Sequence, residues 1–289
     1  MRIGMIGFGE AAFNISWGLS EEGVSGIIAY DAMEADPQMG TLIHTRAKQA
    51  GVALQQSAVA VAAAADVIFA AVPSSYTLDV CRSVREALGP DKLYIDVSAS
   101  TPLVKQQVWE MVKDTGVLFV DAAMLGSLPQ DRHRVPITAS GNGVARFLEL
   151  MLPLHMNITS AGDRAGDASA IKLVRSIYMK GIAALMIEML QGARSYGVSE
   201  EVVSSIATSM DGIPFRTHLN RLVTGSALHC ERRASELKGS IAMLNEAGLD
   251  ARMTTASMER LEGLKPYAFA ARYVQKKPQG WEEIIDAIK

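Results

Sequence analysis

A glycine-rich turn near the amino terminus constrains the fold more than any other feature of this sequence. An apolar run is followed by Gly7, Gly9 and Ala12, in the spacing G-x-G-x-x-A, and then by residues at helical spacing. A second apolar run ends at Asp31, roughly twenty residues beyond the glycines. The glycines alone are a weak signal. Strand, turn, helix, strand and terminal acid in this order predict a dinucleotide-binding βαβ unit.

Each residue of this turn has a physical task in the prediction. Gly7 permits the tight turn, and Gly9 lets the backbone approach a pyrophosphate while the helix amides point at the anion. The carboxylate of Asp31 suits a free ribose 2′-hydroxyl and repels a 2′-phosphate. We therefore predict NAD as the cofactor, with NADP possible if Arg46 or Lys48 swings in. The alternative is a tight βα turn that binds no ligand.

The alternation of apolar runs and helical spacing continues to residue 160. Such alternation predicts an α/β fold, a Rossmann-type doubly wound and mostly parallel sheet, which binds ligands at the carboxyl ends of its strands. The glycine turn, Asp31 and the segments after later strands are expected to share this rim. The predicted cofactor-binding residues are Gly7, Phe8, Gly9, Glu10, Ala11, Ala12, Asp31, Val72, Pro73, Ser74 and Ser98.

The strand pattern ends before residue 164, and only helical segments follow. The sequence therefore predicts two domains, a dinucleotide-binding Rossmann domain over 1–163 and an all-helical substrate and dimerisation domain over 164–289. Apolar faces on so many helices indicate that a partner chain covers part of the second domain, in a homodimer or higher homo-oligomer.

Composition and charge exclude several classes of protein. The 289 residues are 49% hydrophobic, which suffices for two cores, and a net charge of −3 without a basic run argues against a nucleic-acid partner. The longest apolar run is too short to span a bilayer, so no membrane partner is expected. Because Met1 already begins a predicted strand, no targeting peptide is expected and a cytoplasmic location is the default. The two cysteines form no metal-binding motif, so no metal is predicted.

A long stretch without proline, residues 166–197, predicts a single helix. Apolar residues recur on almost every face of it, which predicts that the helix is buried. Lys172, Arg175 and Ser176 lie at i, i+3 and i+4, so they share one face. Two basic residues in the first turns oppose the helix dipole, so local helix physics does not explain them. Either both side chains snorkel to water, or Lys172 is a catalytic residue projecting into a cleft between the domains.

Motifs along nearly the whole chain resemble the β-hydroxyacid dehydrogenases, the family of the 3-hydroxyisobutyrate and 6-phosphogluconate dehydrogenases. The family's D-x-S-T-x-x-P loop is similar to the segment from Asp96 to Pro102, with Ala99 in place of threonine. Its D-A-P-V-S-G-G loop is similar to residues 121–127, and its G-x-x-x-x-x-K-x-x-N-N segment to residues 166–176. The segment SIYMKG, residues 176–181, also resembles the corresponding segment of a less studied branch of the family, one similar to 6-phosphogluconate dehydrogenase.

The resemblance implies a nicotinamide cofactor, an active site between the domains and roles for individual residues. Lys172 falls on the family's catalytic lysine, which acts as general acid/base, and Glu188 falls on a family glutamate. Ser176, at one of two changed asparagine positions, is the second predicted catalytic residue. The predicted substrate-binding residues are Ser98, Leu125, Gly126, Ser127, Arg175 and Glu236, the last in a segment similar to the family's K-D-L helix.

One departure from the family affects the substrate. Leu125 stands where the family has a carboxylate-binding serine, so a substrate anion needs another anchor. The planar fork of Arg175 suits that task, alone or with Arg132 and Arg134 in a phosphate site; alternatively, Arg175 pairs with Glu236 and braces the domains.

We predict an oxidoreductase that transfers a hydride between a nicotinamide and a hydroxy acid or sugar-acid-like alcohol. The alternatives are an imine or ketone reductase on the same architecture and a non-catalytic dinucleotide sensor.

Overall fold

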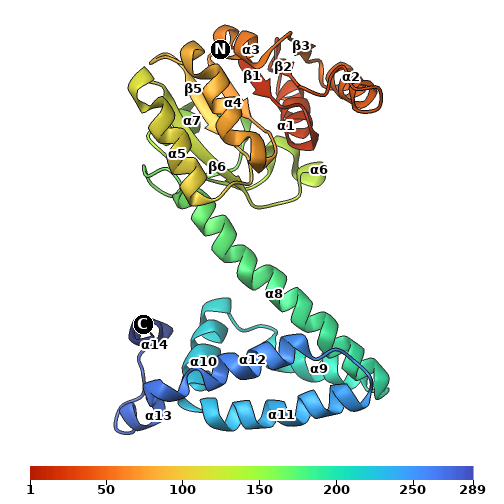
Figure 1. The fold of residues 1–289 in the computed structure, drawn as a ribbon, viewed down its shortest axis with the longest axis vertical. Helices are drawn as coiled ribbons and strands as arrows, with labels where there is room; N and C mark the ends of the chain where they lie inside the picture. The colour runs from red at the N-terminus through yellow and green to blue at the C-terminus, as the bar shows by residue number, and fades with distance from the viewer. Residues whose placement is uncertain (289) are drawn as a thin grey trace. The chain divides into compact units, whose positions relative to one another are not determined.

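The computed structural model describes residues 1–288, which form two compact units comprising residues 1–177 and 178–288 (Figure 1). The division between the units lies inside the longest helix, α8 (Asp167–Ser195). The first turns of α8 therefore belong to the first unit. The domain boundary predicted at 163/164 lies just before this helix, after the last strand.

An eight-stranded sheet forms the centre of the first unit. Its strands are β1 (Ile3–Ile6), β2 (Ile28–Tyr30), β3 (Ala53–Leu54), β4 (Val67–Ala70), β5 (Leu93–Asp96), β6 (Leu118–Met124), β7 (Ile137–Ser140) and β8 (Ile158–Ser160). They lie in the order β3-β2-β1-β4-β5-β6-β7-β8, and all neighbours are parallel except β6 and β7. This confirms the predicted doubly wound, mostly parallel sheet.

Helices cover both faces of this sheet. They are α1 (Glu10–Glu21), α2 (Met39–Ala50), α3 (Ala58–Ala64), α4 (Thr77–Val84), α5 (Pro102–Val112), α6 (Leu128–Asp131) and α7 (Val144–Met151). Successive residues of a strand point to opposite faces. Val67 and Phe69 of β4 accordingly pack in one core with α1, α2 and α7, whereas Ile68 and Ala70 pack in a second core with α3, α4 and α5.

Local sequence signals set the ends of several of these helices. The side chain of Ser57 caps α3, and that of Thr101 caps α5, in which Pro102 takes the first position. Gly51 ends α2 in the left-handed conformation that glycine favours. The helix predicted over residues 166–197 is present as α8, one residue shorter at its start and two at its end. The short α6 was missed, because four residues are too few to show a period.

The strand order places a ligand crevice at the carboxyl end of β1. Strand β1 lies between β2 and β4, so the chain builds one half of the sheet on each side of it. Doubly wound sheets bind ligands where the order reverses in this way. The glycine turn follows β1, and Val72, Pro73 and Ser74 follow β4.

The second unit is helical throughout its described residues, 178–288. After α8 it contains α9 (Ser199–Met210), α10 (Phe215–Leu228), α11 (Cys230–Glu246), α12 (Arg252–Glu262), α13 (Phe269–Arg272) and α14 (Trp281–Ala287). Ala227, Cys230, Leu264, Phe269 and Ile284 form its small core. None of the helices within residues 1–288 is long and apolar enough to cross a membrane.

Glu188 of α8 has a visible structural task in the second unit. Its carboxylate accepts hydrogen bonds from the amides of Met253 and Thr254, each at 2.8 Å, and from the Thr254 hydroxyl at 2.6 Å. Glu188 thereby caps the first turn of α12, although it belongs to another helix far away in the sequence. Burial alone would raise the pKa of Glu188, but the hydrogen bonds from Thr254 and Met253 outweigh burial and lower it.

The prediction that α8 is buried is wrong for its central turns. Val174 and Ile177, near the end of the first unit, are 66% and 74% exposed. Further exposed apolar side chains of α8 in the second unit are Tyr178, Met179, Leu185, Met186, Ile187 and Leu190. Periodicity identifies an apolar surface but does not say which molecule covers it.

Candidate functional site

The glycine turn after β1 has the geometry that its sequence predicts. Gly7 has a φ of +81°, and a Cβ there would lie 2.5 Å from the carbonyl oxygen of Ala71. Its amide donates to the carbonyl of Tyr30 at 2.8 Å. Only glycine fits this combination of backbone conformation and close approach.

Gly9 differs from Gly7 because its surroundings are open. A Cβ on Gly9 would meet no atom within 4 Å. Gly9 also lies directly before α1 and offers the helix no side-chain cap. Among residues 1–288, the amides of Glu10, Ala11 and Ala12 donate to no protein acceptor. Gly9 leaves room for an anionic group such as a pyrophosphate, and the unpaired amides at the start of α1 can donate hydrogen bonds to it. These residues therefore fit a bound dinucleotide.

Asp31 joins the end of β2 to the glycine turn. Its Oδ2 accepts from the amide of Phe8 at 2.6 Å, and its Oδ1 accepts from the amide of Met33 at 2.8 Å. Each carboxylate oxygen has further lone pairs, so Asp31 keeps acceptor capacity for ribose hydroxyls. The residue is half-buried at the rim where the cofactor is predicted to bind.

The other predicted cofactor residues follow β4 and β5. A Cβ on Gly7 would lie 2.8 Å from a side-chain carbon of Val72, so Val72 packs on the turn, whereas Pro73 and Ser74 are exposed beyond it. Ser98 is buried, and its hydroxyl contacts the hydroxyls of Thr77 at 2.9 Å and Ser100 at 2.8 Å. The role of Ser98 in cofactor or substrate binding stays a prediction, and its hydroxyl already has partners inside the protein.

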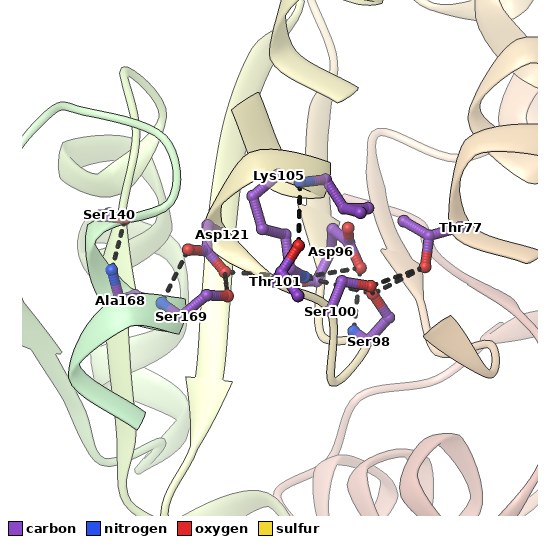
Figure 2. Close-up of polar contacts among 11 residues, drawn as sticks. Thr77, Asp96, Ser98, Ser100, Thr101, Lys105, Asp121, Ser140, Ala168 and Ser169 are labelled. Atoms are coloured by element: carbon purple, nitrogen blue, oxygen red, sulfur yellow. Dashed lines mark hydrogen bonds and ion pairs between the residues drawn. The ribbon is translucent and has the colours of Figure 1, made fainter. Parts of the chain in front are cut away.

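A buried lysine links this hydroxyl cluster to two aspartates (Figure 2). Nζ of Lys105 lies 3.0 Å from Oδ1 of Asp96 and 3.6 Å from Oδ1 of Asp121. It also donates to the Asp96 carbonyl at 2.9 Å and to the Ser98 hydroxyl at 3.3 Å. The side chains of Lys105, Asp96 and Asp121 are completely buried.

The start of α8 is fastened to the same network from two strands, as Figure 2 shows. Asp121 of β6 accepts from the amide of Ser169 at 2.9 Å and from its hydroxyl at 2.8 Å. Ser140 of β7 accepts from the amide of Ala168 at 3.0 Å. Gly166, with a φ of +97°, brings the chain against the carbonyl of Pro102, where a Cβ would approach to 2.8 Å. The first turn of α8 is therefore capped by the sheet.

The predicted catalytic face lies one turn further along α8. Lys172 and Ser176 are half-buried and Arg175 is exposed, all within the first unit. Arg175 forms no ion pair among residues 1–288. In the predicted substrate loop after β6, Leu125 is half-buried and Gly126 and Ser127 are exposed. These substrate and catalytic assignments stay predictions.

Glu236, the remaining predicted substrate residue, lies in the second unit. It is exposed on α11 and pairs with Arg232 of the same helix. Its contact with a substrate stays a prediction.

Arg132 and Arg134 are engaged by acids at the end of α1. Arg132 pairs with Glu21 and its guanidinium lies 3.7 Å from the ring centre of Trp17. Arg134 and His155 hydrogen-bond to the two oxygens of Glu22 at 2.6 and 2.8 Å. Both guanidinium groups are already paired with carboxylates, which argues against the phosphate site that the sequence suggested.

Stability should depend on pH through Glu22. The hydrogen bonds from Arg134 and His155 lower the pKa of Glu22 from 4.5 to about 2. Its contribution to stability is thus complete above pH 4.5 and is lost as the pH falls toward 2. Glu22→Gln should therefore be less stable than the wild type in urea at pH 7, and the difference should shrink toward pH 2. Glu149→Gln, which breaks an exposed pair with Arg146, is the control and should change little at either pH. A Glu22→Gln deficit that stays constant with pH would contradict this.

Sequence reasoning missed three residues of the buried network, Lys105, Thr77 and Ser169, although it had named Asp96 and Ser98. Lys105 left a signal, because Lys105, Val108 and Val112 lie on one face of α5 and all three are buried. A lysine at a core position of an amphipathic helix calls for a buried partner. Thr77 and Ser169 left no such signal. Among residues 1–288, no group of three metal-binding side chains is assembled.

Two families match separate parts of the chain. Residues 2–100 match the family described as "NADP oxidoreductase coenzyme F420-dependent", and residues 193–264 match a domain of unknown function, DUF1932. The first match covers the glycine turn, Asp31 and the β4 and β5 loops. The second covers most of the helical unit.

Three proteins are similar to most or all of the chain. An uncharacterized 28.5 kDa protein in the 7S RNA 5′ region of Methanothermus fervidus is 26% identical over 237 residues, 82% of this chain and 88% of that protein. A conserved protein of unknown function, whose structure is described as similar to 3-hydroxyacid dehydrogenases, is 29% identical. The two structures superpose with a TM-score of 0.63, and the match covers 92% of this chain and 97% of that protein. A reductive aminase from Aspergillus terreus, in complex with NADPH and ethyl-5-oxohexanoate, shares the fold. Its TM-score is 0.72 at 17% identity, covering 100% of this chain and 99% of that one.

The glycine turn, the unpaired amides of α1 and the family match over residues 2–100 all indicate that the first unit binds a dinucleotide. The chain therefore contains an NAD(P)-binding Rossmann domain followed by a helical unit, and most of its length is similar to a protein whose structure is described as similar to 3-hydroxyacid dehydrogenases.

Proposed function

We propose that this protein transfers a hydride between a nicotinamide and the carbinol carbon of a hydroxy acid or sugar-acid-like alcohol, with Lys172 as general acid/base. The observation that carries the proposal is the fastening of the first turn of α8 to β6 and β7, because it fixes the helix face that bears Lys172. Lys172 lies three residues after Ser169, so the two residues share a face of the helix.

The glycine turn would hold the dinucleotide. The bare backbone of Gly9 and the unpaired amides of Glu10 and Ala11 would face the pyrophosphate, and Asp31 would accept from the adenosine ribose. When bound, the nicotinamide accepts or donates the hydride. The protein supplies orientation and proton transfer.

Lys172 would manage the proton that accompanies the hydride. In oxidation, the neutral amine takes the hydroxyl proton as the carbinol becomes a carbonyl; in reduction, the ammonium returns it. Ser176, four residues along the same helix face, would hydrogen-bond the reacting oxygen. The test is a nicotinamide absorbance screen with both cofactors across hydroxy acids, sugar acids, ketones and imines. Turnover of hydroxy acids or their keto forms is expected, and a protein that turns over none of these four classes would contradict the proposal.

An imine or ketone reductase is the second candidate. Leu125 gives the substrate loop an apolar side chain where a carboxylate-binding serine would favour a hydroxy acid. A reductive aminase shares the fold, although the identity of 17% extends the likeness to the fold alone. The lysine at position 172 favours the alcohol reaction, and amine products in the same screen would favour the reductase.

Cofactor choice should follow the charge at Asp31. Its carboxylate repels a 2′-phosphate, and the guanidinium of Arg46, which would counter that repulsion, lies over the Phe13 ring at 5.6 Å from its centre. Fluorescence titration should therefore show tighter binding of NADH than of NADPH. Asp31→Asn should reduce the preference. Tighter binding of NADPH by the wild type would contradict the assignment, and the "NADP" in the description of the matching family makes this a sharp test.

Arg175 is proposed to hold an anionic or polyhydroxylated substrate. It is exposed, it forms no ion pair among residues 1–288, and it lies on the face of Lys172. Arg175→Met should then raise KM far more than it lowers kcat, because the contact is equally strong in ground and transition states. Arg164→Met, which breaks an exposed pair with Asp167, is the control and should leave KM unchanged. A fall in Tm with an unchanged KM would show that Arg175 is structural.

We also propose that the protein is a homodimer or higher homo-oligomer assembled through its helical unit. The exposed apolar side chains of α8 in that unit, from Tyr178 to Leu190, support this, because a helix that is apolar on almost every face is normally covered. Sedimentation equilibrium should report at least twice the chain mass, and the mass of one chain at micromolar concentration would contradict it.

A further inference from the structure

Two buried aspartates lie side by side on neighbouring strands. Asp96 and Asp121 are register partners on the parallel strands β5 and β6, and both side chains are completely buried. Like charges at neighbouring positions of a sheet repel each other, and the repulsion grows away from water. Lys105 of α5 supplies the cation that offsets this repulsion, since its Nζ contacts a carboxylate oxygen of each aspartate.

Stability alone is a weak explanation for this network. It contains one cation for two carboxylates, and Oδ2 of Asp96 is buried without a hydrogen-bond partner. Buried ion networks often contribute no more to stability than apolar side chains of the same volume. A buried polar atom without a partner in a native structure calls for another explanation.

The network ends at the helix that bears Lys172. Oδ1 of Asp121 contacts Nζ of Lys105 and also accepts a hydrogen bond from the hydroxyl of Ser169 (Figure 2). Oδ2 of Asp121 accepts a second hydrogen bond, from the amide of Ser169. Ser169 and Lys172 are one turn apart on the same face of α8. A helix turn is rigid, so the orientation of Ser169 sets the direction in which Lys172 leaves the helix.

We propose that Lys105 is a positioning residue for the hydride-transfer reaction. Its ammonium holds the carboxylate of Asp121 in the orientation that grips Ser169, and this fixes the first turn of α8 and therefore Lys172. The inference rests on the proposed role of Lys172. Lys105 has no exposed surface, so its side chain is not accessible to substrate or cofactor.

Three variants test this. Lys105→Met removes the charge and keeps the side-chain length, and Ser169→Ala cuts the hydroxyl link while leaving the ion network whole. The control is Lys92→Met, because Lys92 also donates inside the first unit, to the carbonyls of Ala63 and Ala65, but at the opposite end of β5. The measurements are kcat, the Kd of NADH, Tm, and hydrogen exchange of the peptide spanning residues 166–176. The substrate is the one that the nicotinamide screen identifies.

Lys105→Met and Ser169→Ala should each lower kcat roughly tenfold or more, because small displacements of a catalytic group cost that much. Their affinity for NADH should stay within about twofold of the wild type, since ground-state binding is untouched. Exchange in residues 166–176 should accelerate in both. Lys92→Met should lower Tm without these effects.

Unchanged kcat and exchange in Ser169→Ala would overturn the proposal, and so would a Lys105→Met protein that loses only Tm. If Lys105→Met does not fold, Ser169→Ala decides the matter. Failure of the proposed function is distinguishable, because full activity in Lys172→Met would disprove the role of Lys172 whatever the exchange shows.

Discussion

Lys172→Met should lower kcat by roughly 10²–10⁴, the usual contribution of a positioned general acid/base. Methionine keeps the length of the side chain and removes the proton that must move with the hydride. The anchoring of α8 through Ser169 and Ala168 does not involve the side chain of residue 172. Affinity for NADH and Tm should therefore change little. Steady-state turnover of the substrate from the screen gives kcat, an NADH titration gives the affinity, and a thermal melt gives Tm.

Lys180→Met is the matched control for this variant. Lys180 lies on the same helix eight residues further on, in the second unit, and is exposed. The same substitution there should leave kcat near the wild-type value. If Lys172→Met keeps most of its activity while Lys180→Met loses it, the assignment of the acid/base to Lys172 is wrong.

Gly9→Ala should weaken dinucleotide binding by roughly tenfold or more, equivalent to about 1.4 kcal/mol or above. A methyl group at Gly9 would meet no protein atom within 4 Å, so the protein itself has room for it. The space it enters is the space through which a pyrophosphate would approach the amides of α1. Tm without cofactor should therefore stay at the wild-type value while the Kd of NADH rises.

Two further glycine substitutions make this result specific. Gly239→Ala adds a methyl group in open space within α11 and should leave the Kd of NADH unchanged. Gly7→Ala combines a φ of +81° with a backbone oxygen at 2.5 Å, so it should lose stability as well as binding. Wild-type affinity in Gly9→Ala would show that the dinucleotide does not lie across this turn.

Much of the fold follows from local patterns in the sequence. The glycine turn, Asp31 and the alternation of strands and helices predicted the doubly wound sheet, because each depends on chemistry within about thirty residues, the size of a βαβ unit. The cap of α5 was also predictable, since Thr101 and Pro102 act on the helix that they begin. The close approaches of Gly7 to Ala71 and of Gly166 to Pro102, by contrast, join segments that lie far apart in the sequence.

The rest depends on contacts between distant segments. The chain spacing of Asp121 and Ser169 gives no hint that one holds the other, and the antiparallel pairing of β6 and β7, which sets Ser140 beside Ala168, is invisible in local spacing. The predicted burial of α8 fails for a related reason. Its apolar residues show that a cover is needed, but the pattern is the same whether the cover is the same chain or another.

Tracing the hydride tests the proposed reaction most directly. The protein would be incubated with reduced nicotinamide carrying deuterium at C4 and with matched ketone, keto-acid and imine substrates, and the products would be analysed by mass spectrometry and NMR. Our account predicts deuterium on the carbinol carbon of a hydroxy-acid product, formed at a rate that Lys172→Met lowers by roughly 10²–10⁴. Deuterium on the carbon of an amine product, formed equally well by wild type and Lys172→Met, would contradict it.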